Sequence, residues 1–214
     1  WFYAVVGNHE RMFADYLMSI DPDTEWESSG AMDLFLYNGG DWATEDPTVY
    51  WDQRQQLIQN LRALPLILSV ETPDDGIFHV AHGDLMLDKD SIMKDSDIQS
   101  LEREVQADEV VYQGMTAERL TDHVVWSRRL IKHPAGHLGI RQSEGLSRVY
   151  VGHTIQKTPR EIASHVFIDG GAYLRALDPQ AKGYGLNLIE HCAGTIYRLR
   201  SSDVESGNVE DLLE

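Results

Sequence analysis

The chain has 214 residues, of which 42% are hydrophobic and 25% charged, a composition that excludes collagen-like and intrinsically disordered proteins. Its 35 acidic and 18 basic residues give a net charge of −17, which argues against a surface that binds nucleic acid by neutralising phosphates. We find no apolar run of about 18 residues and no signal-peptide pattern at the start. The single cysteine, Cys192, forms no internal disulfide. These features predict a cytoplasmic protein with neither a nucleic-acid nor a membrane partner.

The first third of the chain predicts a strand, a helix, a loop and a second helix. Residues 1–6 are aromatic and β-branched, which predicts a buried strand. Apolar residues then recur at helical spacing over residues 10–20. Residues 21–46 are rich in Asp, Glu, Gly and Ser, which favours a loop. The helical pattern resumes over residues 47–64, with Asp46 as the expected N-cap ahead of a proline.

The middle of the chain predicts a hairpin and two helices. Two β-branched runs, residues 66–71 and 76–81, are joined by a short turn-forming stretch, which predicts antiparallel pairing. The second run ends directly before His82. Helical spacing follows over residues 96–105 and 116–132.

The last third of the chain predicts strands and a tail. Residues 148–151, 165–168 and 186–200 have the β-branched content of strands, and a break at a glycine makes the last of them a hairpin. Residues 201–214 carry acids and no base, which predicts an acidic tail beyond a domain of residues 1–200. Early strand and helix alternation followed by strands predicts an α/β fold with a mixed sheet.

Three segments, VVGNHE, VAHGD and VYVGHT, each place a histidine directly after an apolar strand; these are His9, His82 and His153. Strand ends are where open sheets collect active sites. Imidazole nitrogens and an amide oxygen, such as that of Asn8, suit a divalent transition metal. His79 lies three residues before His82, and an odd separation along a strand puts the two side chains on opposite faces. We therefore assign His79 to packing.

In this order, the strings GNHE, strand-HG and GHT resemble the calcineurin-like metallophosphoesterases, and most closely their protein Ser/Thr phosphatases of the bacteriophage-lambda type. The stretches NGGDW, VVWSRR and FIDGGA are also similar to that family, so the resemblance covers roughly residues 1–200. It implies an α/β fold, a two-sheet sandwich flanked by helices with metals at the strand ends. It also implies a metal-dependent phosphomonoesterase whose substrate is a phosphoprotein or phosphopeptide.

The same resemblance assigns roles to individual residues. Two divalent ions, Mn²⁺ by expectation with Fe or Zn as alternatives, would lie about 3.5–4 Å apart and activate a water. The ligands of the second ion would be Asn8, His82 and His153. His9 would give a proton to the leaving alkoxide. Arg128 would bind the substrate phosphate, with Arg129 as the alternative if the register is shifted by one residue.

This sequence also departs from the family pattern. The motifs Asp-x-His-Gly and Gly-Asp-x-x-Asp-Arg-Gly, which supply the first metal's ligands and the bridging Asp, precede GNHE in the family, whereas seven residues precede Asn8 here. The family's arginine before GNHE is Val6 in this chain, which leaves phosphate binding to Arg128. We therefore expect an N-terminally truncated domain that is inactive as given. Two alternatives are a dinucleoside tetraphosphatase with the same metal chemistry and a non-catalytic binding module.

Overall fold

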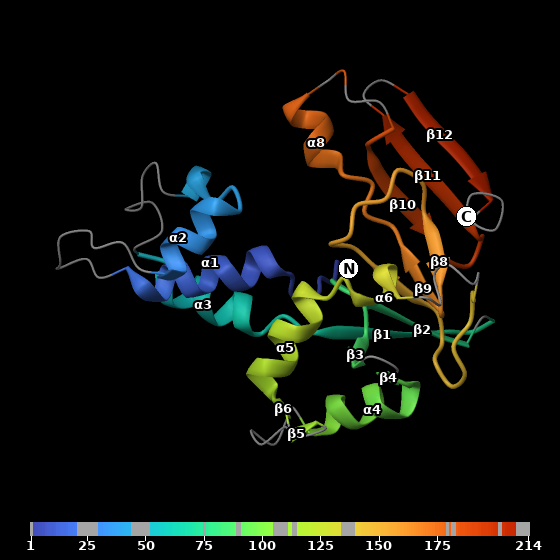
Figure 1. Ribbon diagram of the computed structural model, residues 1–214, viewed down its shortest axis with the longest axis horizontal. Helices are drawn as coiled ribbons and strands as arrows, with labels where there is room; N and C mark the ends of the chain where they lie inside the picture. The colour runs from blue at the N-terminus through green and yellow to red at the C-terminus, as the bar shows by residue number, and fades with distance from the viewer. Residues whose placement is uncertain are drawn as a thin grey trace. The chain divides into compact units, whose positions relative to one another are not determined.

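The computed structural model describes residues 2–20, 30–43, 52–74, 76–88, 91–104, 111–112, 115–133, 140–178, 180, 183–200 and 203–208. The chain forms two compact units, Trp1–Leu66 and Ile67–Glu214, which are taken in turn below (Figure 1). The expected division into a domain of residues 1–200 and an acidic tail stays a prediction.

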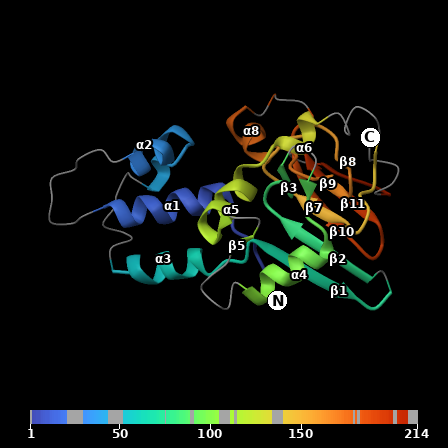
Figure 2. The same ribbon diagram turned by 60° about the horizontal axis from the view of Figure 1, so that its bottom comes forward.

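The first unit is helical in its described residues. Its elements are α1 (Asn8–Ser19), α2 (Gly30–Tyr37), the 3-10 helix η1 (Asp41–Ala43) and α3 (Arg54–Arg62). Helix α1 lies between α2 and α3 (Figure 2). The rings of Tyr16 and Phe35 stack with their centroids 5.0 Å apart in the core of this unit. The loop predicted over residues 21–46 is therefore wrong at α2, where burial of Phe35 stabilises a helix that is too short to show a clear pattern.

Two other predictions for this unit concern residues 1–6 and residues 46–64. The strand predicted over residues 1–6 is wrong for the described residues 2–6, which form no strand; the Val6 N–H donates to the Pro65 carbonyl over 2.9 Å. Helix α3 lies inside the predicted range 47–64, but the predicted N-cap Asp46 lies outside the described residues.

The second unit is built on a five-stranded sheet in the order β1-β2-β7-β9-β8. Its strands are β1 (Ile67–Thr72), β2 (Gly76–Ala81), β7 (Val149–Val151), β8 (Arg160–Ile162) and β9 (His165–Phe167). Strands β1 and β2 form the predicted antiparallel hairpin. Strands β2, β7 and β9 run parallel, so their carboxyl ends lie at one edge of the sheet. Two short pairs accompany this sheet: β3 (Met86–Asp88) with β4 (Ser91–Ile92), and β5 (Val111–Tyr112) with β6 (Met115–Thr116).

A second sheet packs against the first. Its strands are β10 (Leu186–Glu190), β11 (Thr195–Arg200) and β12 (Asp203–Asn208). Ile196 of β11 shares an apolar cluster with Tyr150 of β7 and Val166 of β9. The α/β class with two packed sheets and helices is therefore confirmed. Strand β12 lies within residues 201–214, which the acidic composition predicted to be a tail. It forms a strand because its backbone pairs with that of β11, and backbone hydrogen bonding does not depend on side-chain charge.

The helices of this unit are α4 (Asp95–Glu104), α5 (Ala117–Trp126), α6 (Arg129–Lys132) and α8 (Ala172–Leu177). Thr116 caps α5 through a 3.3 Å hydrogen bond from the Arg119 N–H to its Oγ1. The single helix predicted over residues 116–132 is wrong, since the backbone of Ser127 is extended and separates α5 from α6. None of the helices in the described segments is long and apolar enough to cross a membrane.

Candidate metal and phosphate site

The parallel strands β2 and β7 bring two of the predicted metal ligands together. Ala81 pairs with Val151 at the last position of each strand, so the segments that follow the two strands start side by side. The His82 carbonyl then accepts a 2.9 Å hydrogen bond from the Gly152 N–H. The imidazoles of His82 and His153 lie with their centroids 5.0 Å apart.

His153 adopts an unusual backbone conformation. Its φ of 57° lies in the left-handed region, which few residues other than glycine adopt. The turn is closed by a hydrogen bond from the Thr154 N–H to the Gly152 carbonyl. Such a conformation costs about 1–3 kcal/mol and clusters at functional sites, where the surroundings hold it in place. The backbone strain at His153 therefore marks it as a candidate functional residue.

The spacing of this histidine pair fits a shared metal ion. A metal–nitrogen distance of about 2.1 Å puts an imidazole centroid about 3.2 Å from the ion, so two ligands at about 90–110° have centroids about 4.5–5.2 Å apart. The observed 5.0 Å lies within that range. In the described segments, however, no group of three or more His, Cys, Asp or Glu side chains could hold a metal ion. The second unit thus brings two imidazoles together, and a metal ion bound there would need further ligands.

Of the two candidate phosphate arginines, Arg128 lies beside the histidine pair. Its Nη2 donates a 3.4 Å hydrogen bond to the His153 carbonyl. The indole of Trp126 contacts the His153 imidazole edge to face, with 5.8 Å between centroids. Arg129 instead donates from Nη1 to the Leu87 carbonyl over 2.7 Å. Arg128 is therefore the better placed to meet an anion bound at His153.

Glycine at position 83 allows the His82 loop to approach the end of α5. A Cβ atom at Gly83 would lie 2.1 Å from the Val124 carbonyl oxygen and 3.1 Å from that of Ser127. Both are backbone atoms, which cannot rotate away as a side chain can. The HG string thus reflects a close backbone approach beside His82.

Asp84 is a buried carboxylate that the sequence analysis left unassigned. Its Oδ1 accepts hydrogen bonds from the Ser127 hydroxyl at 2.7 Å and the Met86 N–H at 3.2 Å, and its Oδ2 accepts from the Leu130 N–H at 3.1 Å. The side chain is fully buried. Its position two residues after His82 is the one signal in the sequence, because the partners Ser127 and Leu130 lie more than 40 residues further along the chain.

His165 supports the same loop from the other side. Its Nδ1 donates to the Ala163 carbonyl over 2.8 Å, and its Nε2 accepts from the Leu85 N–H over 3.1 Å. This pattern needs the neutral imidazole, in which one nitrogen donates and the other accepts. Burial lowers the pKa of His165, although hydrogen bonding to Ala163 and the nearby Asp84 oppose that effect.

The GNHE string lies at the start of α1 in the first unit. Gly7 is the N-cap, and its N–H donates to the Glu10 carboxylate over 3.0 Å, which fixes the first turn of the helix. Asn8 is buried and His9 is exposed in this unit. That these two residues meet His82 and His153 in one active site stays a prediction.

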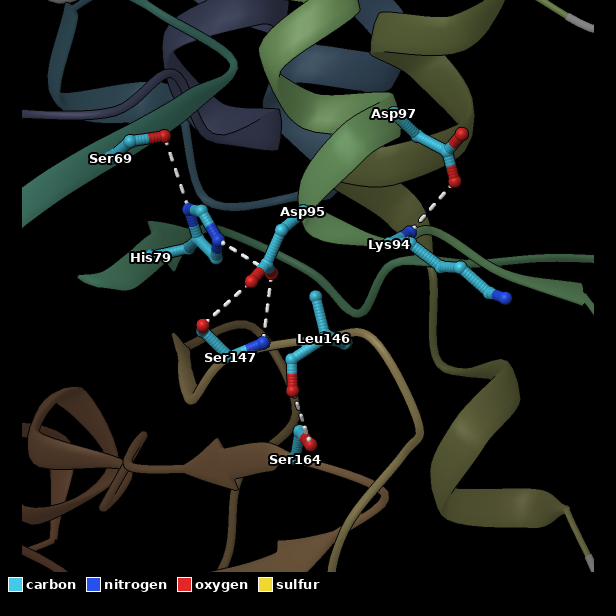
Figure 3. Close-up of polar contacts among 8 residues, drawn as sticks. All are labelled: Ser69, His79, Lys94, Asp95, Asp97, Leu146, Ser147 and Ser164. Atoms are coloured by element: carbon cyan, nitrogen blue, oxygen red, sulfur yellow. Dashed lines mark hydrogen bonds and ion pairs between the residues drawn. The ribbon is translucent and has the colours of Figure 1, made fainter. Parts of the chain in front are cut away.

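A second polar cluster, made of Ser69, His79, Asp95 and Ser147, lies in the second unit (Figure 3). His79 Nδ1 lies 3.1 Å from the Ser69 hydroxyl and Nε2 lies 3.1 Å from Asp95 Oδ1. Partial burial raises the pKa of Asp95, but hydrogen bonds from the Ser147 N–H and hydroxyl and from His79 outweigh it and leave the pKa below its usual value. The His79 side chain is fully buried, so a substrate could not reach it. The cluster joins β1 and β2 to α4, and the assignment of His79 to packing is confirmed.

Comparison with known proteins shows a similarity to a phosphatase. No protein-family model matches the chain. The chain is 26% identical over 174 residues to serine/threonine-protein phosphatase 2 of Salmonella typhimurium, which covers 81% of this chain and 63% of that protein. The chain therefore spans less than two thirds of that relative's length. At family level, this similarity agrees with the resemblance to protein phosphatases found in the sequence.

Proposed function

We propose that this chain is part of a metal-dependent phosphomonoesterase that hydrolyses phosphoserine or phosphothreonine in proteins. The observation that carries the proposal is the His82–His153 pair at the carboxyl ends of parallel strands, with Arg128 hydrogen-bonded to the His153 carbonyl. Metal ligands and an anion-binding group side by side are what metal-assisted hydrolysis of a phosphate ester uses. The similarity to a Salmonella protein named as a serine/threonine phosphatase supports the same class.

The proposal gives each residue of this chain a distinct task. A pair of bound divalent ions would polarise the phosphate and lower the pKa of a water. His82 and His153 would hold one ion through their imidazoles, joined by the Asn8 amide oxygen. Arg128, which is exposed, would orient the phosphate through its planar guanidinium. His9, at the first turn of α1, would donate a proton to the leaving alkoxide.

The activity is tested by comparing the chain as given with a version extended at its N-terminus by the two motifs that supply the first metal's ligands. Both are assayed with Mn²⁺ on p-nitrophenyl phosphate, on a phosphoserine peptide and on a dinucleoside tetraphosphate. We expect negligible turnover by the chain as given, because it lacks a bridging carboxylate, and turnover of the first two substrates by the extended version.

Three results would count against the proposal. Equal activity in the two versions would show that the upstream ligands are not needed. An extended version that folds and binds metal but hydrolyses nothing would favour a binding module. Preference for the dinucleoside tetraphosphate would move the protein to a different substrate class.

A further inference from the structure

We propose that Asp84 is a positioning residue that holds Arg128 beside the metal-binding histidines; this inference rests on the proposed function. The Asp84 carboxylate is fully buried and lies two residues after His82. Its hydrogen bonds reach the residues on both sides of the two arginines, namely the Ser127 hydroxyl at 2.7 Å and the Leu130 N–H at 3.1 Å. One side chain therefore links the His82 loop to the Arg128 loop.

The break between α5 and α6 explains why such a link is needed. Ser127 is extended and Arg128 is the N-cap of α6, so neither lies within a helix that would fix the arginine's position. The first N–H groups of a helix have no acceptor within the helix. At the start of α6, the Asp84 carboxylate accepts from the Leu130 N–H and so caps the helix from a distant part of the chain. Without it, the buried Leu130 N–H and Ser127 hydroxyl would each lose an acceptor.

The geometry also separates Asp84 from the metal site itself. Both of its carboxylate oxygens accept hydrogen bonds, two on Oδ1 from Ser127 and Met86 and one on Oδ2 from Leu130. Asp84 therefore acts on Arg128 through Ser127 and Leu130. Its loss should weaken binding of a phosphate group while leaving metal binding by His82 and His153 close to that of the unmodified chain.

The chain supplies a matched control in Asp95. This carboxylate also accepts a 2.7 Å hydrogen bond from a serine hydroxyl and a short one from a backbone N–H, both from Ser147. It lies in the cluster of Figure 3, which contains none of the metal-site residues. Asp84→Asn and Asp95→Asn thus remove comparable interactions, and only the first should affect phosphate binding.

The test uses the full 214-residue chain with Co²⁺ and phenylphosphonate, a probe that is not hydrolysed. We expect Asp84→Asn and Arg128→Ala each to weaken phenylphosphonate binding by about tenfold. The double variant should bind no more weakly than Arg128→Ala alone, because the effect of Asp84 runs through the arginine. Co²⁺ affinity should change less than twofold, and Asp95→Asn should leave probe binding unchanged. Additive losses in the double variant, or an equal loss in Asp95→Asn, would overturn the proposal.

Two further measurements test the positioning role of Asp84 even if the proposed function is wrong or Asp84→Asn does not fold. If the unmodified chain binds no phenylphosphonate, the phosphate site is refuted, and hydrogen exchange at the Leu130 amide then tests Asp84 directly. A folded Asp84→Asn chain should exchange this amide at least tenfold faster, whereas Asp95→Asn should not. Unchanged exchange would overturn the link. If Asp84→Asn does not fold, Ser127→Ala removes one donor to the same carboxylate and should reproduce the loss of probe binding with a smaller effect; no loss in that variant would overturn the proposal.

Discussion

Gly83→Ala should displace the His82 loop, and Gly152→Ala provides a matched control. A Cβ atom at Gly83 would lie 2.1 Å from the Val124 carbonyl oxygen, which is roughly 1 Å inside the closest approach that these atoms tolerate. At Gly152 the nearest atom to an added Cβ is the His82 carbonyl oxygen at 3.6 Å, an ordinary contact. The two glycines lie next to His82 and His153 in the chain, yet only Gly83 lacks room for a methyl group.

The expected cost follows from this overlap. Forcing a methyl group into a packed position costs about 1–3 kcal/mol and sometimes more, because the backbone has to move. For a unit of this size, each kcal/mol lowers the melting temperature by about 2–4 °C, so Gly83→Ala should melt about 2–12 °C below the unmodified chain. Since the same movement separates His82 from His153, Co²⁺ affinity should fall as well.

Circular dichroism melting and a Co²⁺ titration measure both effects. Gly152→Ala should melt within about 1 °C of the unmodified chain. A Gly83→Ala chain that melts and binds Co²⁺ like the unmodified protein would refute the close approach between the His82 loop and α5.

Three further predictions concern individual side chains. In the extended, active version, Arg128→Ala should raise KM for phosphopeptides more than Arg129→Ala does, because Arg129 is hydrogen-bonded to the Leu87 carbonyl; the reverse order in steady-state kinetics would assign the phosphate to Arg129. In the same version, His9→Asn should cut kcat by roughly 10²- to 10⁴-fold on phosphoserine peptides and by less on p-nitrophenyl phosphate, whose leaving group needs little protonation; equal losses, or loss of bound metal, would contradict proton donation. In the chain as given, burial holds the pKa of His165 below 6.5, so the unfolded chain takes up a proton that the folded chain resists, and the free energy of unfolding should fall as the pH drops below about 6.5, by up to about 1.4 kcal/mol per pH unit. His165→Gln should flatten this slope in denaturant titrations between pH 7 and pH 5, and an unchanged slope would contradict a buried neutral imidazole.

Local sequence patterns predicted the elements whose apolar residues are regularly spaced. The β1–β2 hairpin, β7, β9 and the β10–β11 hairpin all appear where β-branched runs indicated them. Helix α2 and the short pairs β3–β4 and β5–β6 were missed, since elements of two to eight residues carry too few positions for a period to emerge. Their stability comes from packing, as in the contact between Phe35 and Tyr16.

The break in the predicted 116–132 helix shows what local patterns cannot supply. Apolar spacing continues across Ser127, yet the Ser127 hydroxyl is bound by Asp84, 43 residues earlier in the chain. The same long-range contact hid Asp84 from the sequence analysis. By contrast, strand parity alone predicted that His79 would pack apart from His82, and His79 is buried with hydrogen bonds to Ser69 and Asp95.

A Co²⁺ titration of the 214-residue chain shows whether His82 and His153 bind one metal ion together. Absorption bands of bound Co²⁺ are followed in the unmodified chain, in His82→Ala, in His153→Ala and in the double variant, with His123→Ala as the control because His123 Nε2 is hydrogen-bonded to the Met86 carbonyl. If the two imidazoles share an ion, each single variant should lose nearly all of the tight binding, the double variant should lose no more, and His123→Ala should bind like the unmodified chain. Tight binding that survives in either single variant, or that is lost in His123→Ala, would contradict the claim.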